Sequence, residues 1–218
     1  MTITLKNSVL DEIDMSYASP TSSFAFKSGI DHYRLLAYIS LQFNNSMLFD
    51  IGTSAGGSAL ALAFNPTNHV CSFDINDTDP ADKQNVTYYI CNILKTPERF
   101  SEMLSSPFIS LDVDPHDGKF EKEFIDLLGV NRYKGMVYMD DTFMNKFPNL
   151  RDYWETITQK KVNVSKVGHG SGIVLLNGCK TTTLFSRLLI ELHVSIWILS
   201  IKTGGGIYNM LFVAGNII

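Results

Sequence analysis

The sequence predicts a doubly wound α/β fold, with a mainly parallel sheet, helices on both faces and a C-terminal antiparallel hairpin. Two observations carry this prediction. Short apolar runs alternate with helical patterns over residues 30–161, which is the order expected for βαβ units. A glycine-rich turn follows the first apolar run, where open α/β sheets commonly bind ligands.

The predicted elements follow from periodicity and from their boundary residues. Apolar, β-branched and aromatic runs predict strands over 47–51, 69–75, 86–91, 108–113 and 135–139. Helical patterns occur over 30–43, 58–64, 97–105, 120–128 and 150–161. Two further runs, 195–201 and 208–213, flank a glycine turn at 203–206 and predict a hairpin. We expect this hairpin to close the parallel sheet.

The composition is that of one compact domain. The chain has 218 residues, of which 45% are hydrophobic, and a net charge of −4, so it can bury a core without cross-links. Three cysteines without a Cys-x-x-Cys pair exclude a disulfide framework and indicate a reducing compartment. The mild acidity gives no footprint for non-specific nucleic-acid binding.

No targeting or membrane segment is expected. Residues 1–23 carry charges throughout and lack a signal-peptide core. The longest apolar stretch, 184–201, is interrupted by Arg187, Glu191 and His193, which argues against a spanning helix. We therefore expect a cytoplasmic protein without a membrane partner.

The most informative segment is the turn FDIGTSAGGS at 49–58. Its glycines let the backbone approach a ligand closely and leave helix N–H groups exposed. Ser54 stands where a dinucleotide fingerprint needs glycine, and Ser58 stands where a phosphate loop needs lysine. Asp50, just before the turn, would repel a pyrophosphate. The turn therefore favours a cationic ligand.

A second acid, Asp74, ends the next predicted strand, 22 residues after Gly52. A carboxylate there can accept both hydroxyls of a ribose. Together the turn and Asp74 resemble the Rossmann-like class I S-adenosylmethionine-dependent methyltransferases. The run DIGTSAGGSAL at 50–60 looks like the catechol O-methyltransferase-like and cephalosporin-hydroxylase-like branches. The resemblance covers residues 30–142 and implies S-adenosylmethionine as the cofactor.

The resemblance also implies roles for individual residues. The glycine turn would face the methionine part of the cofactor, Asp74 would hold the ribose, and Ile75 would pack on the adenine. Asn92 would reach the adenine edge, although an ordinary turn residue is an open alternative. The implied cofactor-binding residues are Asp50, Gly52, Thr53, Ser54, Ala55, Gly56, Ser58, Asp74, Ile75, Asn92 and Asp112.

On this basis we expect one methyltransferase-like domain over residues 1–218. Residues 1–45 would form an N-terminal helical segment on the substrate side. Residues 46–142 would form the cofactor-binding core, and 143–218 the C-terminal part.

Acidic residues follow the fourth and fifth predicted strands, and they should converge near His116. They are Asp112, Asp114, Asp140 and Asp141. Four carboxylates repel unless a cation lies between them, and hard oxygen ligands suit Mg²⁺. By resemblance to metal-dependent O-methyltransferases, the metal ligands would be Asp112, Asp140 and Asp141, with Asp114 an alternative to Asp112. In the alternative without a metal, Asp112 touches the cofactor's amino group and Asp141 caps the following loop.

Methyl transfer is an in-line displacement at a sulfonium carbon, so catalysis is largely positioning and activation of the nucleophile. A divalent ion would lower the pKa of a bound hydroxyl. Without a metal, His116 or His169 would be the general base. His169 lies in a predicted glycine loop at 167–172. The expected catalytic residues are His116, His169 and Asp141.

The predicted function is methyl transfer to an oxygen of a small molecule or sugar, by a chain that could form a homodimer. One alternative is a non-catalytic protein that binds S-adenosylmethionine, suggested by the charge-poor stretch 181–218. Another is a cap-ribose or RNA methyltransferase, which Lys27, Lys160 and Lys161 would serve. The Tyr-x-Asp-Asp run at 138–141 resembles a reverse transcriptase, but its acids lie too close in sequence to Asp112 for that fold.

Overall fold

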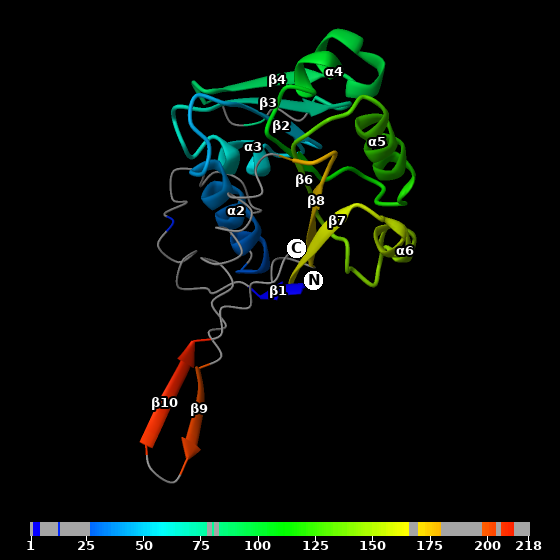
Figure 1. The fold of residues 1–218 in the computed structure, drawn as a ribbon. Coiled ribbons are helices and arrows are strands. Elements are labelled where there is room, and N and C mark those ends of the chain that lie inside the picture. Colours follow the sequence, from blue (N-terminus) through cyan, green and yellow to red (C-terminus); the bar gives the residue numbers. More distant parts are fainter. Residues whose placement is uncertain are drawn as a thin grey trace.

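The computed structural model of the chain describes residues 2–4, 13, 27–77, 80, 83–165, 170–179, 198–203 and 206–211. Its main feature is a single large sheet. The strands of this sheet are β1 (Thr2–Thr4), β2 (Met47–Ile51), β3 (His69–Asp74), β4 (Val86–Ile90), β5 (Phe108–Leu111), β6 (Met136–Met139), β7 (Lys160–Ser165) and β8 (Ser171–Leu175). The eight strands lie in the order β1-β7-β8-β6-β5-β2-β3-β4 (Figure 1).

The winding of the sheet changes direction between β2 and β5. From β2 the chain moves outward through β3 to β4, and all these pairs are parallel. It then returns to β5 on the other side of β2 and continues to β6, again in parallel. Strand β8 is antiparallel to both β6 and β7. The doubly wound, mainly parallel fold class is therefore confirmed, and its switch point is where such sheets bind ligands.

Helices cover both faces of the sheet (Figure 1). The helices are α2 (Lys27–Ser40), α3 (Gly57–Leu62), α4 (Pro97–Met103), α5 (Lys119–Val130) and α6 (Pro148–Thr156), with a 3₁₀ turn at Ile93–Lys95. Side chains alternate between the faces along each strand. In β2, Leu48 packs in the core under α2 and α3, while Phe49 packs in the core under α4, α5 and α6. Among the described residues, none of the helices has the length and apolar character needed to cross a bilayer.

The region after α6 differs from the sequence prediction. The helix predicted over 150–161 begins at Pro148 and ends at Thr156, and the chain re-enters the sheet as β7. The alternating pattern of Val162 and Val164, both buried, explains the strand, because β-branched residues fit a half-buried sheet surface. The predicted glycine loop at 167–172 ends inside β8, which begins at Ser171.

The predicted C-terminal hairpin is confirmed. It consists of β9 (Ile198–Thr203) and β10 (Gly206–Leu211), which pair in antiparallel fashion. In the described part of the chain these two strands form a sheet of their own. The expectation that they close the large sheet is not met. Strand β6, the last of the parallel strands, pairs with β8 and not with the hairpin. Residues 184–197 of the apolar stretch lie outside the described residues.

The contact between β8 and α6 gives a test of the packing. A Cβ at Gly172 would lie 2.1 Å from Cη2 of Trp154, a fully buried ring whose Nε1 donates to Oδ1 of Asn163 at 2.8 Å. The ring cannot move away without loss of that bond, so we expect Gly172→Ala to lower the free energy of unfolding by about 1–3 kcal/mol. Urea denaturation measures this change.

Gly129→Ala is the matched control. Gly129 lies in α5, and a Cβ there would have no atom within 4 Å. Alanine should stabilise the helix by up to about 1 kcal/mol. Equal unfolding free energies for the Gly172→Ala variant and the wild type would contradict the packing of α6 on β8.

Candidate functional site

The glycine turn after β2 lies against the end of β5. Gly52 has a φ of +99°, and its N–H donates to the carbonyl of Phe73 at 2.8 Å. A Cβ at Gly52 would lie 1.6 Å from the carbonyl oxygen of Asp112. Both the backbone angle and the space therefore require glycine here. The ends of β2, β3 and β5 therefore meet at Gly52, which bonds to Phe73 and lies against Asp112.

A cleft with a cavity volume of about 230 Å³, partly open to solvent, lies along the carboxyl ends of β2 to β5. Several predicted cofactor-binding residues line it, namely Gly52, Ser54, Asp74, Ile75, Asn92 and Asp112. The structure thus gathers residues from four separate strand ends at one cleft.

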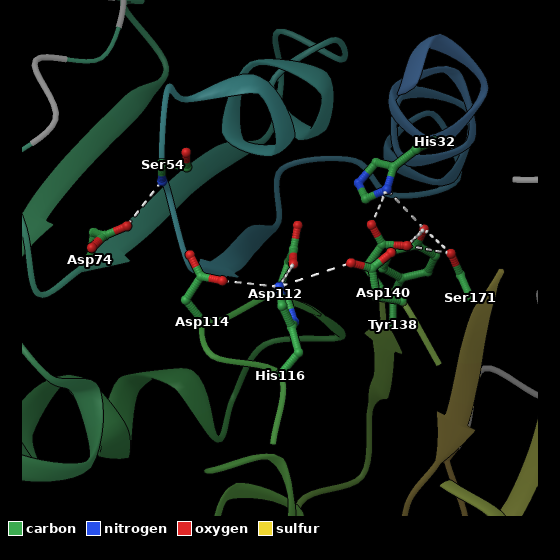
Figure 2. A network of polar contacts seen from close by, with 10 residues as sticks. His32, Ser54, Asp74, Asp112, Asp114, His116, Tyr138, Asp140 and Ser171 are labelled. Carbon is green, nitrogen blue, oxygen red and sulfur yellow. Dashed lines mark hydrogen bonds and ion pairs between the residues drawn. The ribbon is translucent and has the colours of Figure 1, made fainter. Parts of the chain in front are cut away.

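Asp74 fastens the glycine turn to the end of β3. Its carboxylate accepts the N–H of Ser54 at 2.9 Å (Figure 2). It also accepts the N–H of Asn76 at 2.9 Å. An ionised carboxylate has about four lone-pair sites, so it can accept further hydrogen bonds from the cleft. Beside it Ile75 is 68% exposed and presents an apolar surface. Asn92 accepts the N–H of Leu94 at 2.9 Å, so its oxygen already caps the 3₁₀ turn.

Asp50 lies beneath the turn, away from the cleft surface. Its side chain is fully buried and accepts the hydroxyl of Ser72 at 2.7 Å, and Ser72 in turn lies 2.6 Å from the hydroxyl of Thr53. Burial raises the pKa of Asp50 to about 6. Thr53 and Ser58 are also buried, and none of these three lines the cleft.

The acids that follow β5 surround His116 together with Asp141. Nε2 of His116 lies 3.8 Å from Asp112, 3.4 Å from Asp114 and 3.9 Å from Asp141 (Figure 2). The expected convergence is therefore present around an imidazole. Of the three acids, the Asp114 side chain is 96% exposed, whereas that of Asp141 is 15% exposed.

Asp140 is held by a different set of residues. Its Oδ2 lies 2.8 Å from Nδ1 of His32, which comes from α2. Its Oδ1 accepts the hydroxyl of Ser171 at 2.6 Å and that of Tyr138 at 3.3 Å. Figure 2 shows the four side chains meeting at the junction of α2, β6 and β8.

The charges of this cluster depend on one another. Burial lowers the pKa of His32, but the charge and hydrogen bond of Asp140, with the charges of Asp112 and Asp141, raise it to about 9. Burial likewise raises the pKa of Asp140, but the His32 cation and its hydrogen bond bring it below its ordinary value. The pKa of Asp112 is well above its ordinary value because of burial and the neighbouring Asp140 charge. At neutral pH, His32 is therefore an imidazolium paired with the Asp140 carboxylate.

The donor set does not fit the predicted magnesium site. Within the part of the chain that the structure describes, no group of three or more His, Cys, Asp or Glu side chains is arranged to hold a metal ion. One oxygen of Asp140 pairs with the His32 imidazolium at 2.8 Å, and this positive charge opposes a second cation at the same carboxylate. A cation therefore already lies against Asp140, and it is an imidazolium.

His32 is not among the site residues that the sequence predicts. A signal existed, because Leu35, Leu36 and Ile39 are buried and His32 lies three, four and seven residues before them. That spacing puts a histidine on the apolar stripe of α2. Packing against α3 holds α2 beside the site. The ring of Tyr33 in α2 lies so close to Gly57 in α3 that a Cβ at Gly57 would be only 2.7 Å from it. Tyr38 on the same helix is buried in the core.

Two other predicted contributors are not part of the described site. His169 lies outside the described residues. Lys161 donates to the carbonyls of Trp154 and Glu155 at the end of α6, so its ammonium group is engaged with that helix.

The His32–Asp140 pair predicts a pH dependence of stability. The pKa of His32 is raised from 6.5 to about 9 on folding, so the folded chain binds this proton more tightly. The resulting stabilisation, about 3 kcal/mol, is complete below pH 6.5 and is lost as the pH rises through 9. Urea unfolding from pH 6 to 10 should show this decline in the wild type and a smaller one in Asp140→Asn. Identical pH profiles for the two proteins would contradict the ion pair.

Comparisons with known proteins bear on the fold. No protein-family model and no curated protein matches the chain. Among solved structures, a candidate caffeoyl-CoA O-methyltransferase from Staphylococcus aureus is similar, with a TM-score of 0.52 and 17% identity over 66% of this chain and 82% of that one. A cofactor-bound protein from MTB has a TM-score of 0.51 and 14% identity over 78% of this chain and 87% of that one. The chain therefore has the fold found in O-methyltransferases, as the resemblance of its glycine turn implied.

Proposed function

We propose that the chain binds S-adenosylmethionine in the cleft and transfers its methyl group to an oxygen of a small molecule or sugar. The observation that carries this proposal is the gathering of the glycine turn, Asp74 and Asp112 at one cleft beside the switch point of the sheet. The names of the similar structures, an O-methyltransferase and a cofactor-bound protein, agree with it.

The lining of the cleft matches the parts of this cofactor. Asp74 retains acceptor capacity for the ribose hydroxyls. Ile75, Val113 and Phe120 supply apolar walls for an adenine ring. The buried carboxylate of Asp50 beneath the turn favours a positive charge above it. When bound, the cofactor supplies an electrophilic methyl group on a sulfonium.

The residues beside the cleft are suited to an acceptor hydroxyl. A hydroxyl must lose its proton to become a good nucleophile, and general bases and fixed charges assist this. Two imidazoles, of His116 and His32, lie at the carboxylate edge next to the cleft. This favours an oxygen acceptor over one that carries no exchangeable proton.

The cofactor assignment is tested through Asp74. Calorimetry with S-adenosylhomocysteine should give binding to the wild type and at least about tenfold weaker binding to Asp74→Ala, because two ribose hydrogen bonds to a charged group are lost. Asp152→Ala, which neutralises an exposed acid on α6, is the control and should bind like the wild type. Absence of binding to the wild type, or equal binding to Asp74→Ala, would refute the proposal.

A transfer assay separates an enzyme from a protein that only binds the cofactor. Wild-type protein and radiolabelled S-adenosylmethionine would be incubated with a panel of phenols, sugars and hydroxy acids. We expect label to move to one class of hydroxyl. Tight cofactor binding without transfer to any member of the panel would favour the non-catalytic alternative.

Magnesium dependence is tested in the same assay. Because Asp140 is engaged by His32 and Ser171, we expect EDTA to leave the transfer rate unchanged and Mg²⁺ to leave the melting temperature unchanged. A rate that falls at least tenfold in EDTA and returns with Mg²⁺ would show instead that Asp112, Asp140 and Asp141 rearrange around a metal.

A further inference from the structure

His32 is held rigidly on one side of its ring. Nδ1 lies 2.8 Å from Oδ2 of Asp140. The ring makes an edge contact with Tyr138, with centroids 5.4 Å apart and planes at 85°, and a tilted contact with Tyr33 at 4.9 Å. Asp140 is fixed in turn by the hydroxyl of Ser171 at 2.6 Å. The orientation of the imidazole is therefore determined by groups from α2, β6 and β8.

The other ring nitrogen has no such partner. His32 is only 5% exposed, and its buried Nε2 makes no hydrogen bond to any group in the described part of the chain. A buried polar atom without a partner destabilises the folded state and is uncommon in native structures.

The free side of the ring faces the carboxylate edge. In Figure 2, Nδ1 turns toward Asp140, and the opposite nitrogen points away from it toward the side where Asp112 and the glycine turn lie. The His32 cation interacts electrostatically with Asp112, Asp141 and Asp50. Asp112 lines the cleft, so one of the carboxylates that interact with His32 belongs to the proposed cofactor site.

We propose that Nε2 of His32 holds the acceptor oxygen of the methyl transfer and that the imidazolium stabilises this oxygen in its ionised form. The inference rests on the proposed function. His32 acts as a fixed cation: its Nε2–H donates to the oxygen, the hydroxyl proton leaves to solvent water, and the oxygen keeps the electron pair with which it attacks. The raised pKa of His32, about 9, agrees with this role because the ring keeps both N–H groups at neutral pH.

This assignment differs from the roles expected for the other histidine of the edge. His116 has three carboxylates within 4 Å of one nitrogen, so that nitrogen is already directed at anions of the protein. Its ring packs on Phe147 at 4.5 Å. Nε2 of His116 therefore faces acids of the protein, whereas Nε2 of His32 retains an unused donor for a ligand.

The test uses 4-nitrophenol, a hydroxyl compound whose ionised form has its own absorption band. Protein saturated with S-adenosylhomocysteine would be titrated with this probe, and the pKa of the bound probe would be compared with that of the free probe. We expect the wild type to lower the pKa of the bound phenol by about 1 to 3, as a nearby cation does. In His32→Gln, which keeps a donor to Asp140 but no charge, this lowering should disappear.

His69→Gln is the matched control. His69 is the first residue of β3, so it lies at the amino ends of the strands, away from the carboxylate edge. Its ring lies 3.0 Å from the hydroxyl of Thr87. This variant should lower the pKa of the bound probe as much as the wild type does. An unchanged lowering in His32→Gln, or a wild type that binds the cofactor product but leaves the probe unbound or unshifted, would overturn the role of His32.

Nuclear magnetic resonance of the wild type covers the case in which His32→Gln does not fold. With ¹⁵N-labelled histidine and bound S-adenosylhomocysteine, addition of 4-nitrophenol should shift the Nε2 resonance of His32 and not that of His69. An unmoved His32 resonance overturns the proposal. Failure of the wild type to bind S-adenosylhomocysteine would instead refute the proposed function, so the two failures are distinguishable.

Discussion

The repulsion among carboxylates at one edge of the sheet is the constraint on which the site depends. Parallel strands end at a common edge, so acids that follow β5 and β6 must lie close together. They are Asp112, Asp114, Asp140 and Asp141, and two imidazoles separate them into two groups. Without the His32 cation, this repulsion would be relieved only by protonation of the acids, with raised pKa values. Against the effect of burial, the His32 cation therefore keeps the pKa of Asp140 below its ordinary value.

The same constraint explains the position of α2. The helix buries its apolar stripe in the core under one face of the sheet, and His32 is a buried polar residue on that stripe. Burial alone would favour a neutral imidazole, but Asp140 reverses this preference. The ion pair thus fixes the helix against the ends of β6 and β8. The contact between His32 and Asp140 therefore determines both the position of α2 and the charge at this edge.

Much of the fold could be predicted because its signals are local. The run at 47–51 and the glycines after it predicted both β2 and the turn, since a buried parallel strand and a positive φ leave clear marks in sequence. Strands β7 and β8 were missed because Lys160 and Lys161 continued a helical pattern and because Ser171 and Gly172 read as a loop. Gly172 is a glycine for a non-local reason, namely the ring of Trp154. Such a requirement is set by packing between distant segments and leaves no local pattern.

The candidate site divides in the same way. Asp74 and Asp112 could be placed at the cleft from the strand–turn–helix pattern, because Asp74 ends β3 and Asp112 follows β5 directly. The partner of Asp140 could not, because His32 is 108 residues away in sequence and reaches it only through the packing of α2. The sequence therefore predicts an edge of acids that needs a cation, and it suggests Mg²⁺ as that cation because no local pattern pairs His32 with these acids.

The identity of that cation changes the chemistry expected at the edge. A divalent metal binds several oxygens at once and can orient an acceptor through two of its atoms. An imidazolium carries one charge and offers one directed N–H once Asp140 has taken the other. Under the proposed function, an edge built on His32 would bind a single acceptor oxygen along the direction of this N–H, whereas a metal would chelate two oxygens. Because the ring is fixed by Asp140, Tyr138 and Tyr33, that direction is a property of the fold itself, and substrate specificity would follow from which oxygen of a ligand can meet it.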